Sequence, residues 1–73
     1  MTENTYYTAA DLNERLKNLY AERSLAVATG LGDNGLYMAE LDEDIESSRA
    51  AYVGAAVTEI ATLRGELSGR NQG

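Results

Sequence analysis

The chain has 73 residues, with twelve Asp and Glu against six Lys and Arg, and it contains neither cysteine nor histidine. A chain of this length forms one small domain, whose core contributes only roughly 3–5 kcal/mol of stability. The missing residue types exclude disulfides, thiolate zinc sites, thiol nucleophiles and a histidine base, and the net charge of −6 disfavours nucleic-acid binding.

Residues 1–7 show no hydrophobic period, so we expect them to form a flexible N-terminal arm. They have no basic start and no apolar run, which argues against a signal peptide. No stretch of the chain is apolar enough to span a membrane, and we expect a soluble protein made in the cytoplasm.

A first helix is predicted over 9–23. Thr8 is a good N-cap, and Asp11 three residues later completes an arrangement that resembles a capping box. The apolar residues then recur at the spacing of one helical face, at Leu12, Leu16, Leu19 and Tyr20.

A second helix is predicted over 47–68, followed by a flexible tail at 69–73. Ser47 or Ser48 can cap its start, and Gly69 suits a C-terminal stop. Its apolar positions form one continuous stripe, made of Val53, Ala56, Val57, Ile60, Leu63 and Leu67. Small residues of this helix, Ala50, Ala51, Gly54, Ala55, Ala56 and Gly65, leave a smooth surface, which we expect to pack against the first helix or to let another backbone approach closely.

The residues between the two helices are too many for an ordinary helix–helix connection of about 2–8 residues. Apolar and β-branched residues on both sides of Asp33-Asn34-Gly35 indicate a two-stranded β-hairpin over 25–41. The preferred fold is therefore α+β, with two antiparallel helices and a short β-hairpin between them.

The alternative is an all-α helical hairpin. Alanine, leucine and methionine favour helices, so the first helix can extend to Ala28 and a single long helix can run from Tyr37 to Leu67. One helical face then collects Tyr37, Leu41, Ile45 and Tyr52.

No catalytic or ligand-binding motif is found. The glycines of 30–35 match neither a phosphate-binding loop nor a calcium loop, because the lysine and the alternating oxygen ligands are missing. The acidic run at 40–46 is typical of a solvated segment. We expect no enzymatic activity, no cofactor and no metal. Tyr6 and Tyr7 lie on the arm outside any periodic segment, and tyrosine is enriched at interfaces, so both are candidate partner contacts.

The order of elements resembles the head-to-tail joining protein W family of tailed phages, over residues 8–68. The resemblance rests on the first helix, DLNERLKNLYAERS, a short apolar strand pair around a Gly/Asp turn, and the second helix, AYVGAAVTEIATLRGEL. It implies a non-enzymatic α+β protein that completes the phage head.

In such a role the protein forms a homo-oligomeric ring on the portal protein at the head–tail junction of the virion, and provides the platform for the next neck or tail protein. The resemblance implies neither sequence-specific nucleic-acid binding nor membrane association. The expected contact residues are Tyr6, Tyr7, Leu31, Asp33, Asn34, Leu36 and Arg70.

Two other functions remain open from the sequence. The net charge of −6 also fits a small acidic phage inhibitor that mimics DNA and binds a basic protein. A helical-hairpin scaffold or dimerisation module follows if the all-helical alternative is the right fold.

Overall fold

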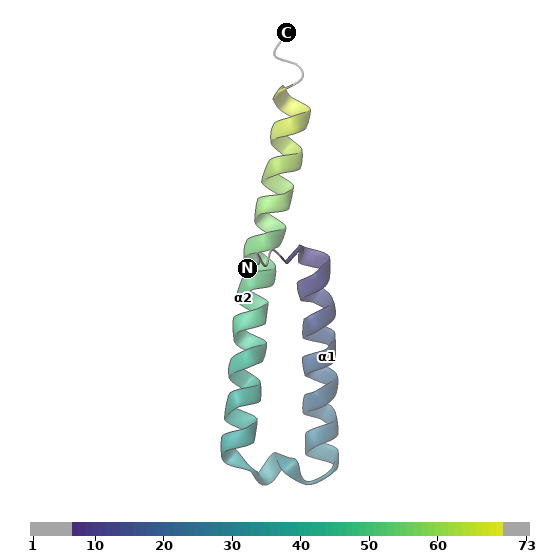
Figure 1. Ribbon diagram of the computed structural model, residues 1–73, viewed down its shortest axis with the longest axis vertical. Coiled ribbons are helices and arrows are strands. Elements are labelled where there is room, and N and C mark those ends of the chain that lie inside the picture. Colours follow the sequence, from purple (N-terminus) through teal and green to yellow (C-terminus); the bar gives the residue numbers. More distant parts are fainter. Residues whose placement is uncertain (1–6, 70–73) are drawn as a thin grey trace, which may run out of the picture.

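The computed structural model describes residues 7–69, which form an antiparallel helical hairpin (Figure 1). Helix α1 (Ala9–Ala28) is followed by the short 3₁₀ turn η1 (Leu31–Asp33) and the long helix α2 (Gly35–Gly69). No strand occurs within these described residues. The α+β prediction with a β-hairpin over 25–41 is therefore wrong, and the all-helical alternative gives the fold.

The start of α1 is the predicted capping box. The Thr8 hydroxyl accepts a hydrogen bond from the Asp11 amide at 3.1 Å, and the Asp11 carboxylate accepts one from the Thr8 amide at 3.3 Å. These two bonds satisfy amide groups that have no partner within the helix. The predicted first residue of this helix, Ala9, is confirmed.

The end of α1 lies five residues beyond the predicted 23, at Ala28. The prediction took the apolar run that starts at Leu25 as a strand. Ala26, however, is only 2% exposed, and it continues the helical series of the buried residues Leu12, Leu16 and Leu19. Burial against the rest of the hairpin thus decided the conformation of a segment whose local propensity was ambiguous.

Residues 29–34 connect the helices, a length typical of helical hairpins. The Thr29 hydroxyl and amide both donate to the Leu25 carbonyl, and Gly30 then adopts a left-handed conformation with φ of 94°. The Asn34 side chain accepts a hydrogen bond from the Tyr37 amide at 3.0 Å, which caps α2. Asp33-Asn34-Gly35 therefore starts a helix and does not form a hairpin turn.

Helix α2 begins twelve residues before the predicted 47 and includes the acidic run at 40–46. Ser47 and Ser48 lie inside the helix and cap nothing. Ser48 is instead buried, and its hydroxyl accepts a hydrogen bond from Arg15 Nε of α1 at 2.9 Å. Within the run, Leu41 and Ile45 are one helical turn apart and both are buried.

The core lies between α1 and the first half of α2. It is formed by four residues and two flanking tyrosines: Leu16, Leu19, Leu41, Ile45, Tyr37 and Tyr52. The Tyr37 hydroxyl donates to the Glu22 carboxylate, and this hydrogen bond raises the pKa of the tyrosine. A core of this size is small, so the free energy of unfolding of the isolated hairpin is low.

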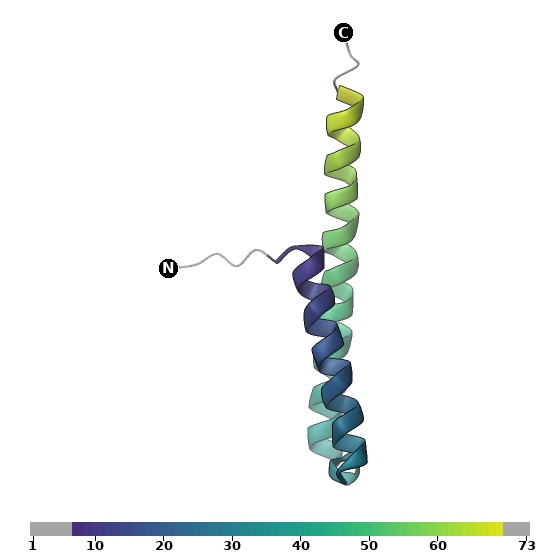
Figure 2. The ribbon, with the colours of Figure 1, turned by 90° about the vertical axis from the view of Figure 1, so that its right-hand side faces the viewer.

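The two helices differ strongly in length, with 20 residues in α1 and 35 in α2. At the rise of an α-helix these lengths correspond to about 30 Å and about 52 Å. The first residue of α1, Ala9, lies beside Glu59 of α2, so residues 60–69 of α2 extend beyond α1. Figures 1 and 2 show this extension from two directions, with α1 alongside only the lower part of α2.

Candidate interaction surface on α2

The far part of α2 carries a row of large apolar side chains that the hairpin does not bury. Their exposed fractions range from 48% for Val53 to 61% for Leu67. We call this row the α2 stripe: Val53, Val57, Ile60, Leu63 and Leu67. The sequence predicted these residues as part of one apolar helical face, and the structure leaves their side chains exposed.

Leaving the α2 stripe in water has an energetic consequence. Burying an aliphatic side chain of this size contributes roughly 1.5–3 kcal/mol, and none of the five side chains gains that in the isolated hairpin. Residues 60–69 continue a helix that α1 already supports, and most helical stability in proteins comes from the packing of an apolar face. A further surface that covers this segment would bury its apolar side chains and strengthen its helix.

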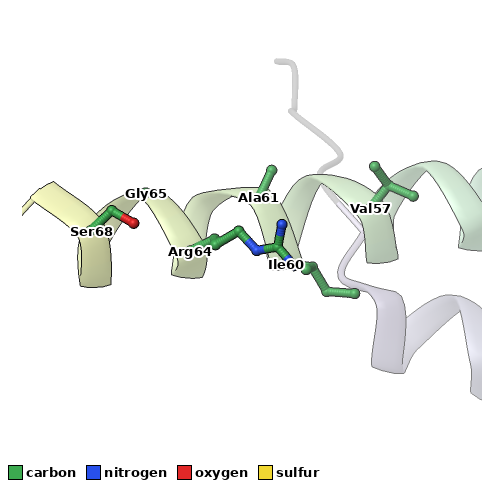
Figure 3. Close-up of a pocket in the computed structure, with 6 residues that line it drawn as sticks. All are labelled: Val57, Ile60, Ala61, Arg64, Gly65 and Ser68. Atoms are coloured by element: carbon green, nitrogen blue, oxygen red, sulfur yellow. The ribbon is translucent and has the colours of Figure 1, made fainter.

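A shallow hollow lies along the α2 stripe. Figure 3 shows its lining, which comes entirely from one helix: Val57, Ile60, Ala61, Arg64, Gly65 and Ser68. Small-molecule sites enclose most of the ligand between several elements and present convergent polar groups. A hollow with one helical wall cannot enclose a ligand in that way, and its shape suits an elongated apolar partner such as another helix.

Two charged residues flank the stripe. Glu59 lies on the side of α1, where its carboxylate accepts a hydrogen bond from the Ala9 amide at 2.7 Å. Arg64 lies on the other side, within the hollow of Figure 3. The stripe is therefore bordered by an acid on one side and a base on the other.

The predicted contact residues lie elsewhere. Tyr7 is 62% exposed and lines hollows between the start of α1 and the middle of α2, next to Gly54 and Ala51. Tyr6 and Arg70 lie outside the described residues. Of the predicted contacts within residues 7–69, Tyr7 lies nearest to the α2 stripe.

The four remaining candidates lie at the closed end of the hairpin, away from the α2 stripe. Leu31 and Leu36 are exposed, as expected for contact residues, but they belong to η1 and the first turn of α2 and not to a β-hairpin tip. Asn34 has a structural role as the cap of α2. Asp33 belongs to η1 and lines a small hollow with Arg23.

Exposed apolar side chains at this closed end do not form one continuous row. Leu25 and Val27 are both exposed, yet residues two positions apart on a helix point to different sides. The α2 stripe, in contrast, runs along one side of the helix. It is therefore the stronger candidate for an interaction surface.

The acidic run at 40–46 is partly neutralised within the chain. Arg23 binds Asp42 at 2.7 Å, and this hydrogen bond lowers the pKa of the Asp42 carboxyl. Arg49 binds Glu46 at 3.0 Å. Within residues 7–69, no cluster of three or more His, Cys, Asp or Glu side chains is arranged to hold a metal ion.

Comparison with known proteins adds no relative: no family model, curated protein or solved structure matches the chain. In the part of the chain that the structure describes, neither helix combines the length and apolarity needed to cross a membrane. The case for a function therefore rests on the residues of this chain.

Proposed function

We propose that this chain is a small, non-catalytic protein–protein interaction module, and that the α2 stripe is its binding surface. The observation that carries the proposal is the exposure of five large aliphatic side chains along one side of α2, of which Ile60, Leu63 and Leu67 lie beyond the start of α1. Such a row is the usual surface by which an amphipathic helix binds another helix or an apolar groove. The closed half of the hairpin supplies the fold that presents it.

Charge and shape favour a protein partner. A net charge of −6 opposes binding to the anionic surfaces of membranes and nucleic acids. The α2 stripe is narrow, and the charged side chains of Glu59 and Arg64 flank it, which is the pattern of a helix that packs against another helix. The hollow along the α2 stripe has only one helical wall, which gives no support for a small-molecule ligand there.

The predicted role as a phage head-completion protein stays a prediction. It shares with our proposal the class of a structural protein that acts by assembly. The resemblance behind it included a strand pair between the helices, and residues 25–41 are helical or form the helix connection. The order of elements therefore supports the head-to-tail junction less than the sequence suggested.

The acidic-inhibitor alternative also stays a prediction. Two carboxylates of the run at 40–46, those of Asp42 and Glu46, are bound to arginines of the chain itself. A mimic of nucleic acid needs its carboxylates available to a basic partner, so these ion pairs favour the interaction module. A binding partner held mainly by charge would be released steeply by salt, whereas one held by the α2 stripe would not.

Photo-crosslinking in the cells that produce the protein tests the proposal. A benzophenone amino acid is placed at Leu63 in the α2 stripe and, as a matched control, at Thr62, which lies on another side of the same helical turn. We expect position 63 to give a crosslinked product with a polypeptide and position 62 to give none. Absence of a product at 63, with the variant still helical by circular dichroism, would overturn the proposed function.

A further inference from the structure

We infer that the α2 stripe binds a second copy of this chain, forming a parallel, in-register, two-stranded coiled coil over residues 53–67. This inference rests on the proposed function and names the partner. It follows from three features of α2: the identity of the apolar residues at each heptad position, the charges beside them, and the point at which the apolar repeat ends.

The apolar residues of this part of α2 fit a heptad repeat without interruption. Val53, Ile60 and Leu67 occupy position a, and Ala56 and Leu63 occupy position d. Two of the three a positions are β-branched, and Leu63 is at d. In parallel coiled coils this combination favours two strands over three or four.

The flanking charges select the parallel orientation. In the same register Glu59 and Glu66 occupy position g, and Arg64 occupies position e. In a parallel pair, a g residue faces the e residue of the following heptad on the other helix. Glu59 then faces Arg64 of the second copy, and the two-fold axis repeats this ion pair.

An antiparallel pair gives the opposite result. There, g residues face g residues, so Glu59 and Glu66 lie opposite the same acids of the second copy, and like charges repel. Arg64 then faces e residues, where it meets Val57 or another Arg64. The charge pattern therefore disfavours the antiparallel arrangement.

Helix α1 lies beside this seam and does not cover it. The residues of α2 that face α1 alternate between position c, at Leu41 and Ser48, and position g, at Ile45, Tyr52 and Glu59. Position g of one helix adjoins position e of the other, so the start of α1 comes close to Val57 of the second copy. This neighbour accounts for an apolar residue at an e position.

The hydrogen bond of Glu59 is compatible with the dimer. Its Oε2 accepts from the Ala9 amide, and a carboxylate has further lone pairs on both oxygens to accept from an arginine. The two exposed glycines of this region lie away from the seam, with Gly54 at position b and Gly65 at f. A Cβ at either one meets nothing within 4 Å.

The seam has a clear lower end. The a and d positions before Val53 are Glu46 and Arg49, which bind each other at 3.0 Å. Charged residues at a and d do not pack in a two-stranded core, so the two copies separate below Val53. There, each α2 is covered by its own α1. The result is a dimer joined by the extended ends of two hairpins.

Sedimentation equilibrium on the full chain tests the second copy as occupant. We expect a reversible dimer whose helix content rises with protein concentration, because residues 60–69 gain a partner. The substitution Ile60→Glu should weaken dimerisation by more than about 100-fold, since it removes one buried aliphatic side chain from each copy. The matched control Thr62→Glu adds the same charge at position c and should leave dimerisation within about threefold.

Disulfide crosslinking tests the orientation, and it is clean because the chain has no cysteine of its own. In a parallel in-register pair, the cysteine of Val53→Cys lies next to the same cysteine of the second copy. The same holds for Leu67→Cys. Each variant alone should therefore form a disulfide-linked dimer under mild oxidation. If only a mixture of the two variants becomes linked, the helices are antiparallel and the inference is overturned.

Charge exchange gives a third measurement. Arg64→Glu alone and Glu59→Arg alone each place like charges across the seam twice, and each should weaken its own dimer. Mixed together, the two variants regain both attractive pairs and should form a heterodimer preferentially. A single-copy mass up to millimolar concentration, or a trimer, would overturn the inference. The proposed function would then still hold if photo-crosslinking at Leu63 captured a different protein, and would fail if nothing was captured.

Discussion

The backbone amide of Ala9 donates a hydrogen bond of 2.7 Å to the carboxylate of Glu59, fifty positions away in the sequence. The contact places a negative charge at the positive end of the α1 dipole and satisfies an amide that has no partner within the helix. It also marks where α1 begins beside α2, and therefore the point beyond which α2 and its stripe extend without α1 alongside. The Ala9–Glu59 contact therefore lies at the boundary between the paired part of the hairpin and the part of α2 that extends alone.

Replacing Glu59 with alanine should lower the free energy of unfolding by about 1 kcal/mol, because the Ala9 amide and the helix dipole lose their carboxylate. Urea denaturation followed by circular dichroism measures the change. Glu66→Ala on the same helix is the control and should change stability by less than about 0.5 kcal/mol. Equal effects of the two substitutions would contradict a role for the Ala9–Glu59 contact. The measurements are made on dilute protein, so that dimerisation does not contribute to the measured stability.

Removing the capping box should also destabilise α1. Thr8→Ala removes the hydroxyl that accepts from the Asp11 amide and should lower the free energy of unfolding by about 1 kcal/mol. Thr8→Ser keeps the hydroxyl and is expected to retain most of that stability. The midpoint of urea unfolding for the three chains checks this prediction, and an alanine variant as stable as the serine variant would refute it.

The small core predicts a sharp contrast between two leucines of α2. Leu41 is buried between the helices, and Leu41→Ala should lower the free energy of unfolding by about 2–5 kcal/mol, which is comparable to the whole stability of such a domain. Leu36 is 71% exposed, and Leu36→Ala should change it by no more than about 0.5 kcal/mol. Circular dichroism should therefore show a largely unfolded chain for the first variant and a folded one for the second.

The Arg23–Asp42 ion pair gives a prediction for acid. The hydrogen bond from Arg23 lowers the pKa of Asp42 in the folded chain, so the folded state favours the charged carboxylate. Its contribution to stability is complete above the ordinary pKa of aspartate and is lost as the pH falls through the lowered one. An NMR titration of the Asp42 carboxyl carbon should show its pKa rise towards the ordinary value in Arg23→Gln. An unchanged titration would show that the arginine does not bind Asp42 in solution.

Two glycines should respond in opposite directions to alanine. Gly30 has a φ of 94°, and alanine there should cost about 1–2 kcal/mol because its Cβ disfavours left-handed backbone. Gly54 lies inside α2 with open space around the position of a Cβ, so Gly54→Ala should raise the free energy of unfolding by about 0.5–1 kcal/mol. Thermal and urea unfolding of both variants measure these changes. A stabilising effect at Gly30 would contradict the connection as described.

The periodicity of the sequence identified the apolar residues, but it assigned only some of them to the correct secondary-structure element. It gave the capping box of Thr8 and Asp11 and the start of α1 at Ala9. The second helix was predicted to end at 68, and α2 includes Gly69, the last residue that the structure describes. The periodicity also placed Tyr37, Leu41, Ile45 and Tyr52 on one face in the all-helical alternative. It then preferred a β-hairpin, because short apolar runs such as that at Leu25 have similar local patterns in strands and helices.

For the candidate surface, the sequence supplied the stripe itself, from Val53 to Leu67, with its period and its apolar side chains. Only the tertiary structure decided which part of α2 is covered. That outcome depends on the connection at 29–34, which sets where α1 begins beside α2, and on the burial of Ala26, Leu41 and Ile45, which fixes the pairing of the helices. The sequence pattern shows which side chains are apolar. Contacts between segments that are distant in the sequence determine which of these side chains become buried.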